Sequence, residues 1–188
     1  MTDIRTSQSS PLRIDGIVVN NRGGEVGMTL CPGKQGPSIY DASWARNLGE
    51  DIRTIKEWGA VSLVTLMELQ ELSLFGVPGL GDAARRAGLN WLHLPIRDGE
   101  VPDTRFEKLW SDVAASLLRE LGAGQRVVIH CRGGLGRTGL VSGMLLVELG
   151  EIPGKALYRV RKSRPGAVET AEQERYLMSY RPIVYNQN

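Results

Sequence analysis

The residues best suited to chemistry form the segment HCRGGLGRTG, at positions 130–139. One apolar run, VVI, precedes it, and a second, LVSGMLLVEL, follows it. Between a strand and a helix, glycines allow successive backbone N–H groups to turn toward one point, and the helix N-terminus adds a partial positive charge there. The segment therefore predicts a loop that holds a phosphate or a similar oxyanion.

The pattern GLGRTG within this segment also matches the dinucleotide-binding fingerprint G-x-G-x-x-G. In that fold an acidic residue about 20 residues further on ends a second strand and holds the ribose. The corresponding region here reads ALYRVRKSR, which is basic and helical in character. The Lys-Ser/Thr pair of a Walker loop is missing as well. We therefore expect the loop to bind no nucleotide cofactor.

Cys131 and Arg137 give the loop a different interpretation, as a nucleophile and its phosphate ligand. The inward-facing amides and the helix N-terminus would stabilise a thiolate, so we expect Cys131 to be ionised at neutral pH. The guanidinium of Arg137 can bind two phosphate oxygens at once. If both residues were only structural, Cys131 would be a small buried hydrophobe, but the cation at the helix N-terminus would then lack its anion. The pair predicts nucleophilic attack by sulfur on phosphorus.

The neighbouring residues have supporting roles in this interpretation. Thr138 can donate its hydroxyl to the thiolate or to the departing thiol, and His130 can hold the loop through its ring nitrogens. The side chain of Arg132 is expected at the rim of the pocket, where it would favour anionic substrates. The backbone amides expected to bind the phosphate lie within residues 132–137, among them Arg132, Gly133, Gly134, Leu135 and Gly136.

The motif His-Cys-x5-Arg-Thr at residues 130–138 resembles the signature of the cysteine-dependent protein tyrosine and dual-specificity phosphatases. The resemblance runs from about residue 25 to residue 180 and is greatest to the kinase-associated (cyclin-dependent-kinase-inhibitor-type) dual-specificity phosphatases. It is carried by the segments GMTLCPGK (27–34), LPIRDGEVPD (94–103), HCRGGLGRTG (130–139) and RPGAVETAEQERYL (164–177). It implies a phosphomonoester hydrolase that needs no metal and no cofactor and forms a cysteinyl-phosphate intermediate.

The segment LPIRDGEVPD is the expected source of a general acid. A leaving alkoxide or phenoxide needs a proton, and a carboxylic acid on a mobile loop can supply it and then activate water. Asp98, Glu100 and Asp103 are the carboxylates of this segment. In the phosphatases that the chain resembles, the acid is the Asp directly before Gly, which favours Asp98. Asp103 has the alternative role of capping the helix that follows it.

Four further residues have both a functional and a structural interpretation. Gln173 matches a position where related phosphatases carry a glutamine near the hydrolytic water, although it could equally be a solvated helix residue. Arg161 and Arg164 fit the VRxxRPG pattern of the wider superfamily, with surface or packing roles as the alternative. Cys31 is expected to be a buried packing residue, and a regulatory disulfide with Cys131 is the alternative.

The resulting hypothesis is a dual-specificity-like protein phosphatase acting on phosphotyrosine and on phosphoserine or phosphothreonine. A first alternative is an enzyme of the same mechanism that acts on phosphoinositides or inositol phosphates. Such members tend to carry lysines within the loop, and this loop has none. A second alternative is a non-catalytic phosphate-binding module. Modules of that kind usually lose the Cys, the Arg or the Asp, whereas all three are present here.

The elements around these residues predict the fold. Segments of strand and helix character alternate along the chain, which favours a three-layer α/β domain with a mainly parallel central sheet flanked by helices. We expect residues 1–10 to be a flexible tail and residues 11–188 to be one catalytic domain. The expected strands are 13–20, 25–31, 60–67, 90–96 and 126–129. The expected helices are 43–59, 106–121, one that begins in the glycine loop, one with Pro153 in its first turn, and about 170–180.

The composition excludes several other classes of protein. The 188 residues are 41% hydrophobic and 23% charged, with a net charge of +2, so we expect no general binding to nucleic acid or to membranes. Two cysteines cannot form a disulfide framework, which favours a reducing compartment. The N-terminus lacks the pattern of a signal peptide, and no apolar run is as long as a membrane helix requires. We therefore expect a soluble, cytoplasmic monomer.

Overall fold

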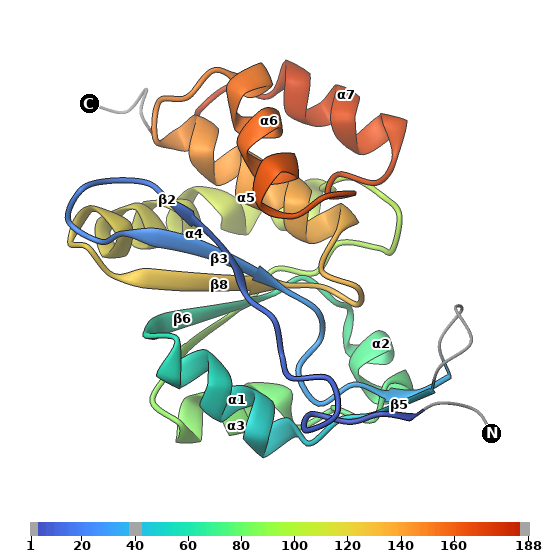
Figure 1. Cartoon of the computed structure of the whole chain (residues 1–188). Coiled ribbons are helices and arrows are strands. Elements are labelled where there is room, and N and C mark those ends of the chain that lie inside the picture. The colour runs from blue at the N-terminus through green and yellow to red at the C-terminus, as the bar shows by residue number, and fades with distance from the viewer. Residues whose placement is uncertain (1–3, 38–42, 185–188) are drawn as a thin grey trace.

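A computed structural model describes residues 4–37 and 43–184. Its main sheet has five strands in the order β2-β3-β8-β6-β7, and every neighbouring pair is parallel except the antiparallel β2–β3 pair. The strands are β2 (Asp15–Val18), β3 (Glu25–Thr29), β8 (Arg126–His130), β6 (Ala60–Thr65) and β7 (Asn90–His93). Helices cover both faces of this sheet (Figure 1). The predicted three-layer α/β architecture is confirmed.

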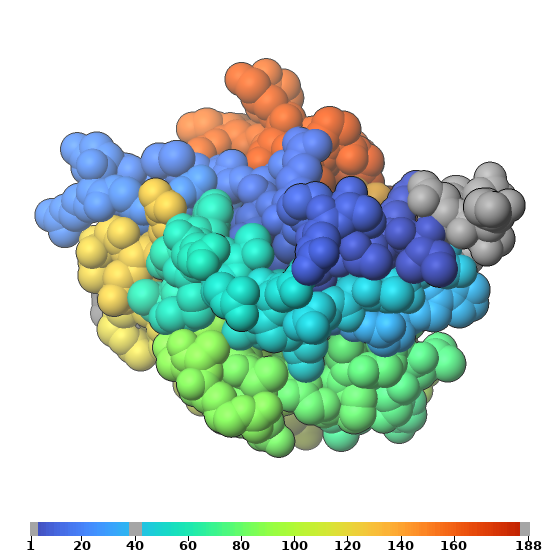
Figure 2. Space-filling model, turned by 60° about the horizontal axis from the view of Figure 1, so that its bottom comes forward, coloured from blue at the N-terminus to red at the C-terminus, as the bar shows by residue number. Residues whose placement is uncertain are grey.

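Helices α4 to α7 cover one face of the sheet, and α1 to α3 lie on the other side (Figure 1). The first group is α4 (Thr104–Gly122), α5 (Gly136–Glu148), α6 (Pro153–Ser163) and α7 (Ala171–Ser179). The second group is α1 (Leu48–Glu57), α2 (Leu69–Leu74) and α3 (Leu80–Arg86). In the space-filling view of Figure 2, α1 and α3 form one continuous face with the N-terminal segments. Because both faces of the sheet are covered, the sequences of the central strands are continuous apolar runs rather than alternating apolar and polar residues.

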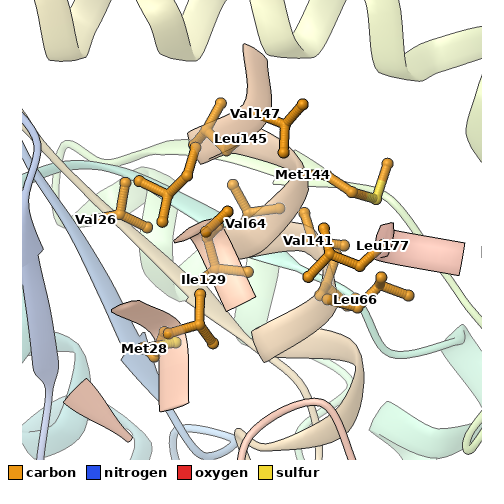
Figure 3. Packing of buried hydrophobic residues seen from close by; sticks show 14 of the residues in the cluster. Val26, Met28, Val64, Leu66, Ile129, Val141, Met144, Leu145, Val147 and Leu177 are labelled. Atoms are coloured by element: carbon orange, nitrogen blue, oxygen red, sulfur yellow. The ribbon is translucent and has the colours of Figure 1, made fainter. Parts of the chain in front are cut away.

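Two hydrophobic clusters lie on either side of the sheet. The larger one joins the sheet to α4–α7, and Figure 3 shows Val26, Val64 and Ile129 of three adjacent strands packed near Val141 and Met144 of α5. All 13 residues of α5 are buried, because α6 and α7 cover the side of this helix that faces away from the sheet. This explains the apolar sequence that follows the glycine loop.

The strand register positions the candidate site at the carboxyl edge of the main sheet. In the three central strands, Thr29, His130 and Thr65 lie side by side at the carboxyl ends of β3, β8 and β6. Ligands of open α/β sheets bind outside this edge. Cys131 is the next residue of the chain, so the fold brings it directly to that edge.

A second, smaller sheet was not predicted from the sequence. Its strands are β1 (Ile4–Arg5), β5 (Ser43–Ala45) and β4 (Gln35–Gly36), in the order β1-β5-β4. The segment expected to be a flexible tail, residues 1–10, thus contains β1, which pairs with β5; residues 1–3 lie outside the described residues. The helix expected over residues 43–59 begins only at Leu48, because Asn47 caps it by accepting a hydrogen bond from Glu50 N.

None of the helices among the described residues combines the length and the apolar character needed to span a membrane.

Candidate active site

The loop after β8 curls around the sulfur of Cys131. Cys131 is buried, and its Sγ accepts a hydrogen bond from Gly134 N at 3.3 Å. Gly134 has φ +73°, and a Cβ there would lie 2.3 Å from the carbonyl oxygen of Thr29, so only glycine fits this position. The loop is also tied to its neighbours, because Cys31 N donates to Arg132 O at 3.3 Å. The loop is therefore shaped around the nucleophile before any substrate binds.

His130 is held as a neutral ring beneath the loop. Its Nε2 lies 2.7 Å from Thr65 Oγ1, which itself accepts a hydrogen bond from Trp91 Nε1 at 2.8 Å. The carbonyl oxygen of Cys131, 3.4 Å from Nδ1, can only accept, so Nδ1 carries the ring proton. In the neutral ring Nε2 is then an acceptor, and the Thr65 hydroxyl donates to it. Complete burial lowers the pKa of His130 to about 3. His130 thus fixes the first peptide of the loop without carrying charge.

The buried ring of His130 makes the stability of the fold depend on pH. Its pKa is about 3 in the folded protein against 6.5 for an ordinary histidine, so the unfolded chain binds the extra proton between these values. The contribution of the neutral His130 to the free energy of unfolding is therefore fully present above pH 6.5 and is lost as the pH falls toward 3. This one residue is expected to make the free energy of unfolding about 2 kcal/mol smaller at pH 5 than at pH 8.

Urea denaturation of the protein and of His130→Gln at both pH values checks this expectation. The glutamine amide can accept the Thr65 proton but does not titrate in this range. The variant is expected to lose less stability than the wild type between pH 8 and pH 5, with a difference of about 2 kcal/mol. An equal loss in the two proteins would contradict a neutral, buried His130.

Arg137 is held by a carboxylate that sequence analysis did not identify. Glu71, in α2, accepts two parallel hydrogen bonds from the guanidinium, at 2.7 and 2.9 Å, and Ile96 O accepts a third at 2.9 Å. The side chain of Arg137 is only 1% exposed. Its Nε is buried and has no hydrogen-bond partner among the described residues. Buried donors are normally paired, so an oxyanion beside Cys131 would satisfy this one.

Asp98 lies in the same cavity and bridges two arginines. Its Oδ1 is 2.9 Å from a terminal nitrogen of Arg137, and its Oδ2 is 2.9 Å from one of Arg132. The Asp98 side chain is 44% exposed, so the carboxylate stands at the mouth of the site. Arg132 is 39% exposed and occupies the rim, where the sequence placed it.

The other two carboxylates of this segment are placed differently. Asp103 is the N-cap of α4, where its Oδ1 accepts hydrogen bonds from Arg105 N at 2.9 Å and Phe106 N at 3.1 Å. The hydrogen bond from the Arg105 side chain, together with that from Phe106 N, lowers the pKa of Asp103. Neither Asp103 nor Glu100 is among the residues that line the cavity. Asp98 is therefore the carboxylate of this segment that faces Cys131.

Gln173 and Glu169 reach the site from the other side of the loop. Gln173 is fully buried and lines the cavity, but its Oε1 accepts from Thr170 N and its Nε2 donates to Glu100 O. Its amide thus ties α7 to the acid-bearing segment. Glu169, which sequence analysis did not identify, accepts a hydrogen bond from Gly136 N at 2.8 Å. The Gly136 amide therefore faces a carboxylate in this structure, rather than the oxyanion expected for it.

Three further residues singled out in the sequence, one threonine and two arginines, have different surroundings in the structure. Thr138 Oγ1 is buried without a hydrogen-bond partner among the described residues, so the expected bond to Cys131 is not formed. Arg164 pairs with Asp15 at 2.6 Å and donates to the carbonyl of Gly133 at 3.1 Å, so it supports the loop from outside. Arg161 donates to the carbonyls that precede α7, at residues 167 and 168.

These side chains surround one cavity of about 260 Å³. Its base carries Cys131, Arg137 and the loop backbone, and Asp98 stands at its mouth. The lining residues are Arg5, Leu30, Lys34, Pro37, Trp44, Phe75, Asp98, Gly99, Cys131, Arg132, Gly133, Leu135, Arg137, Glu169 and Gln173. A nucleophile, a fixed cation and a carboxylic acid group thus converge on a single space, which is the arrangement that transfer of an oxyanionic group requires.

Cys31 lies beneath the same loop. It is fully buried, and burial raises the pKa of its thiol. Both cysteines are free thiols in the structure. The complete burial of Cys31 agrees with the packing role expected for it.

Several known proteins are similar to this chain in sequence and in fold. The family model described as "Polymorphic toxin system, DSP-PTPase phosphatase" matches residues 39–151. Cyclin-dependent kinase inhibitor 3 of Rattus norvegicus is 34% identical over 139 residues, and that of Homo sapiens is 33% identical over 139 residues. Each alignment covers 72% of this chain and 64% of the relative, so the chain spans a little under two thirds of these proteins.

A solved structure agrees with these matches. A crystal structure of kinase associated phosphatase, with its catalytic-site cysteine replaced by serine, superposes with a TM-score of 0.76 at 29% identity, covering 89% of this chain and 93% of that one. The region that the family model matches, residues 39–151, includes β8 and the cavity residues Asp98, Cys131 and Arg137. From its sequence, its fold and the make-up of this site, the chain belongs to the dual-specificity protein phosphatase family.

Proposed function

We propose that this protein is a cysteine-dependent phosphatase that hydrolyses phosphomonoesters on protein side chains. The observation that carries the proposal is the convergence of Cys131, Arg137 and Asp98 on one cavity, where the buried Nε of Arg137 has no acceptor among the described residues. The similarity to proteins named as tyrosine phosphatases, such as the human protein tyrosine phosphatase type IVA 3 at 28% identity, supports the same activity.

In the first step, Cys131 Sγ attacks phosphorus and the bond from phosphorus to the substrate oxygen breaks. Arg137 and the loop amides stabilise the charge that spreads over the other three phosphoryl oxygens. Asp98 donates its proton to the leaving oxygen, so that an alcohol or a phenol departs rather than an anion. Phosphate oxygens and Asp98 compete for the same N–H groups of Arg137, so binding of the phosphate would release Asp98 toward the leaving group.

In the second step, water attacks the phosphorus of the cysteinyl-phosphate. The Asp98 carboxylate accepts a proton from this water, the sulfur–phosphorus bond breaks, and inorganic phosphate leaves with the thiolate restored. His130 takes no part in proton transfer in this scheme, because both of its ring nitrogens face Thr65 and the backbone. Every step uses side chains of one chain, so we also propose that a monomer is active.

The test is hydrolysis of phosphotyrosine and phosphothreonine peptides in the presence of EDTA. Acid quenching during turnover, followed by mass spectrometry of the digested protein, is expected to find one phosphoryl group on the peptide that contains Cys131. Release of phosphate from both peptides would support dual specificity, and release from phosphotyrosine alone would restrict the proposal to tyrosine. A requirement for added metal, or a phosphoryl group on another residue, would overturn the mechanism.

A further inference from the structure

One wall of the cavity carries a buried cation that the proposed chemistry does not use. Lys34 is only 8% exposed and lines the same cavity as Cys131. No hydrogen bond or ion pair joins its ammonium to any of residues 4–37 or 43–184. Its Nζ instead lies 5.0 Å from the ring centre of Trp44 and 5.4 Å from that of Phe75. An ammonium has three donors, and such groups are rarely buried without an acceptor.

The surroundings of Lys34 are also poor in acceptors and rich in donors. Arg5 also lines the cavity, with its Cζ 5.3 Å from the ring centre of Trp44 and no hydrogen bond or ion pair to a described residue. The indole Nε1 of Trp44 is buried and likewise has no partner in the described part of the chain. The carboxylate of Asp98 is already shared between two arginines. Among the described residues, this wall therefore has donors and positive charge to offer, and no carboxylate that is paired with Lys34 or Arg5.

The position of Lys34 is fixed by a rigid frame. Gly33 N donates to Asp51 Oδ2 at 2.8 Å, and Asp51 forms two hydrogen bonds, at 2.7 and 2.8 Å, with the guanidinium of Arg46. Both of these side chains are 1% exposed. Arg46 N in turn donates to the carbonyl of Lys34 at 3.2 Å. A residue held in this way keeps its ammonium on the cavity at little entropic cost when a ligand binds.

Aromatic contacts alone do not account for this arrangement. Burial lowers the pKa of Lys34, which means that its charged form is destabilised where it stands. Cation–π contacts offset part of this cost, but they supply no acceptor to the three N–H donors, and no described residue does so either. An anionic group in the cavity would satisfy those donors and would remove the penalty.

From this geometry we infer that Lys34, with Arg5 and Trp44, forms a second anion subsite beside the phosphate loop. Resting on the proposed function, the inference assigns to the enzyme phosphopeptides in which a second negative group lies close to the phosphorylated residue. The second group is a carboxylate or a further phosphate, since either supplies the oxygens that the ammonium lacks. The phosphate to be hydrolysed binds at Arg137, and the second group binds at Lys34.

Binding measurements in a Cys131→Ser background test the subsite without turnover. Three phosphotyrosine peptides are compared, identical except that the flanking positions carry alanine, glutamate or a second phosphotyrosine. We expect the glutamate and doubly phosphorylated peptides to bind about tenfold more tightly than the alanine peptide. Adding Lys34→Met, which keeps the stem against Trp44 and Phe75 but removes the charge, is expected to abolish this preference.

Two further variants serve as controls. Lys34→Arg retains the charge and is expected to keep the preference. Lys162→Met removes another lysine that lies over an aromatic ring, 5.9 Å from that of Tyr158 on α6, but outside the cavity, and is expected to leave the preference unchanged. Circular dichroism establishes that each variant is folded.

The outcomes separate the subsite from the proposed function. Equal binding of all three peptides, or a preference that survives Lys34→Met, would overturn the subsite. A preference that only the doubly phosphorylated peptide shows would support it with phosphate as its ligand, and one that only the glutamate peptide shows would support it with a carboxylate. Hydrolysis of a small aryl phosphate by the wild-type protein tests the enzyme activity separately, because that substrate has no second anion.

Discussion

Cys131→Ser is expected to reduce hydrolysis of phosphopeptides by about 10⁴- to 10⁶-fold, as loss of a catalytic nucleophile does in other enzymes. The serine hydroxyl is close in size to the thiol, so the loop should keep its shape. It is a far weaker acid than a thiol, however, and needs a base to become a nucleophile. His130 cannot be that base, because its two nitrogens face Thr65 and the backbone carbonyl of residue 131. Steady-state release of phosphate from a phosphotyrosine peptide measures the loss.

Cys31→Ser provides the matched control for this substitution. It makes the same atomic change in the other buried cysteine, and its turnover is expected to stay within a few-fold of that of the wild type. Binding of phosphopeptide to Cys131→Ser establishes that the site is still formed. Turnover by Cys131→Ser within tenfold of the wild type, with binding intact, would show that sulfur at this position is not the nucleophile.

Asp98→Asn is expected to produce a loss that depends on the leaving group. Departure of a threonine alkoxide requires a proton, so hydrolysis of a phosphothreonine peptide should fall by about 10²- to 10⁴-fold. An aryl phosphate with an acidic phenol needs little assistance and should lose much less. Because Asp98 also pairs with Arg137 and Arg132, its neutralisation removes one competing anion from each guanidinium group. A lower inhibition constant for inorganic phosphate should therefore accompany the lower kcat.

Asp103→Asn is the matched control for the acid. Asparagine caps helices as well as aspartate does, so α4 should remain intact, and this residue does not line the cavity. The kcat of Asp103→Asn is expected to stay close to that of the wild type on both the phosphothreonine peptide and the aryl phosphate. Equal losses on the two substrates by Asp98→Asn would assign the proton to another group, and Glu169 is the other carboxylate among the described residues that line the cavity.

The central part of the fold could be predicted because its signals are local. The apolar run before Cys131 and the glycines after it define a buried strand, a turn and a helix within a few residues, and the structure has β8 and α5 there. The same holds for α4, whose apolar residues repeat with helical spacing over 19 residues. Long periodic segments can be assigned from the sequence alone, and the positions of the site residues at their ends can then be predicted as well.

The supporting residues could not be predicted because their signals are not local. Glu71 reaches Arg137 from 66 positions away, on a helix of only six residues that is too short to show a periodic pattern. In the sequence MELQEL it is indistinguishable from a solvated glutamate. Lys34 belongs to a turn beside strands of two or three residues, which show no alternation. Only tertiary packing reveals that these charges are buried and what they face.

The complete burial of α5 has a consequence for how this protein can move. Buried helices belong to the part of a domain that opens last, so we expect amides along α5 to exchange only when the whole domain unfolds. The phosphate loop runs directly into this helix and shares its resistance to local opening. We therefore expect the backbone of the loop to keep the same conformation with and without bound substrate. We expect motion in the catalytic cycle to involve the segment that carries Asp98, because its partly exposed carboxylate is held at the mouth by ion pairs that a phosphate can replace.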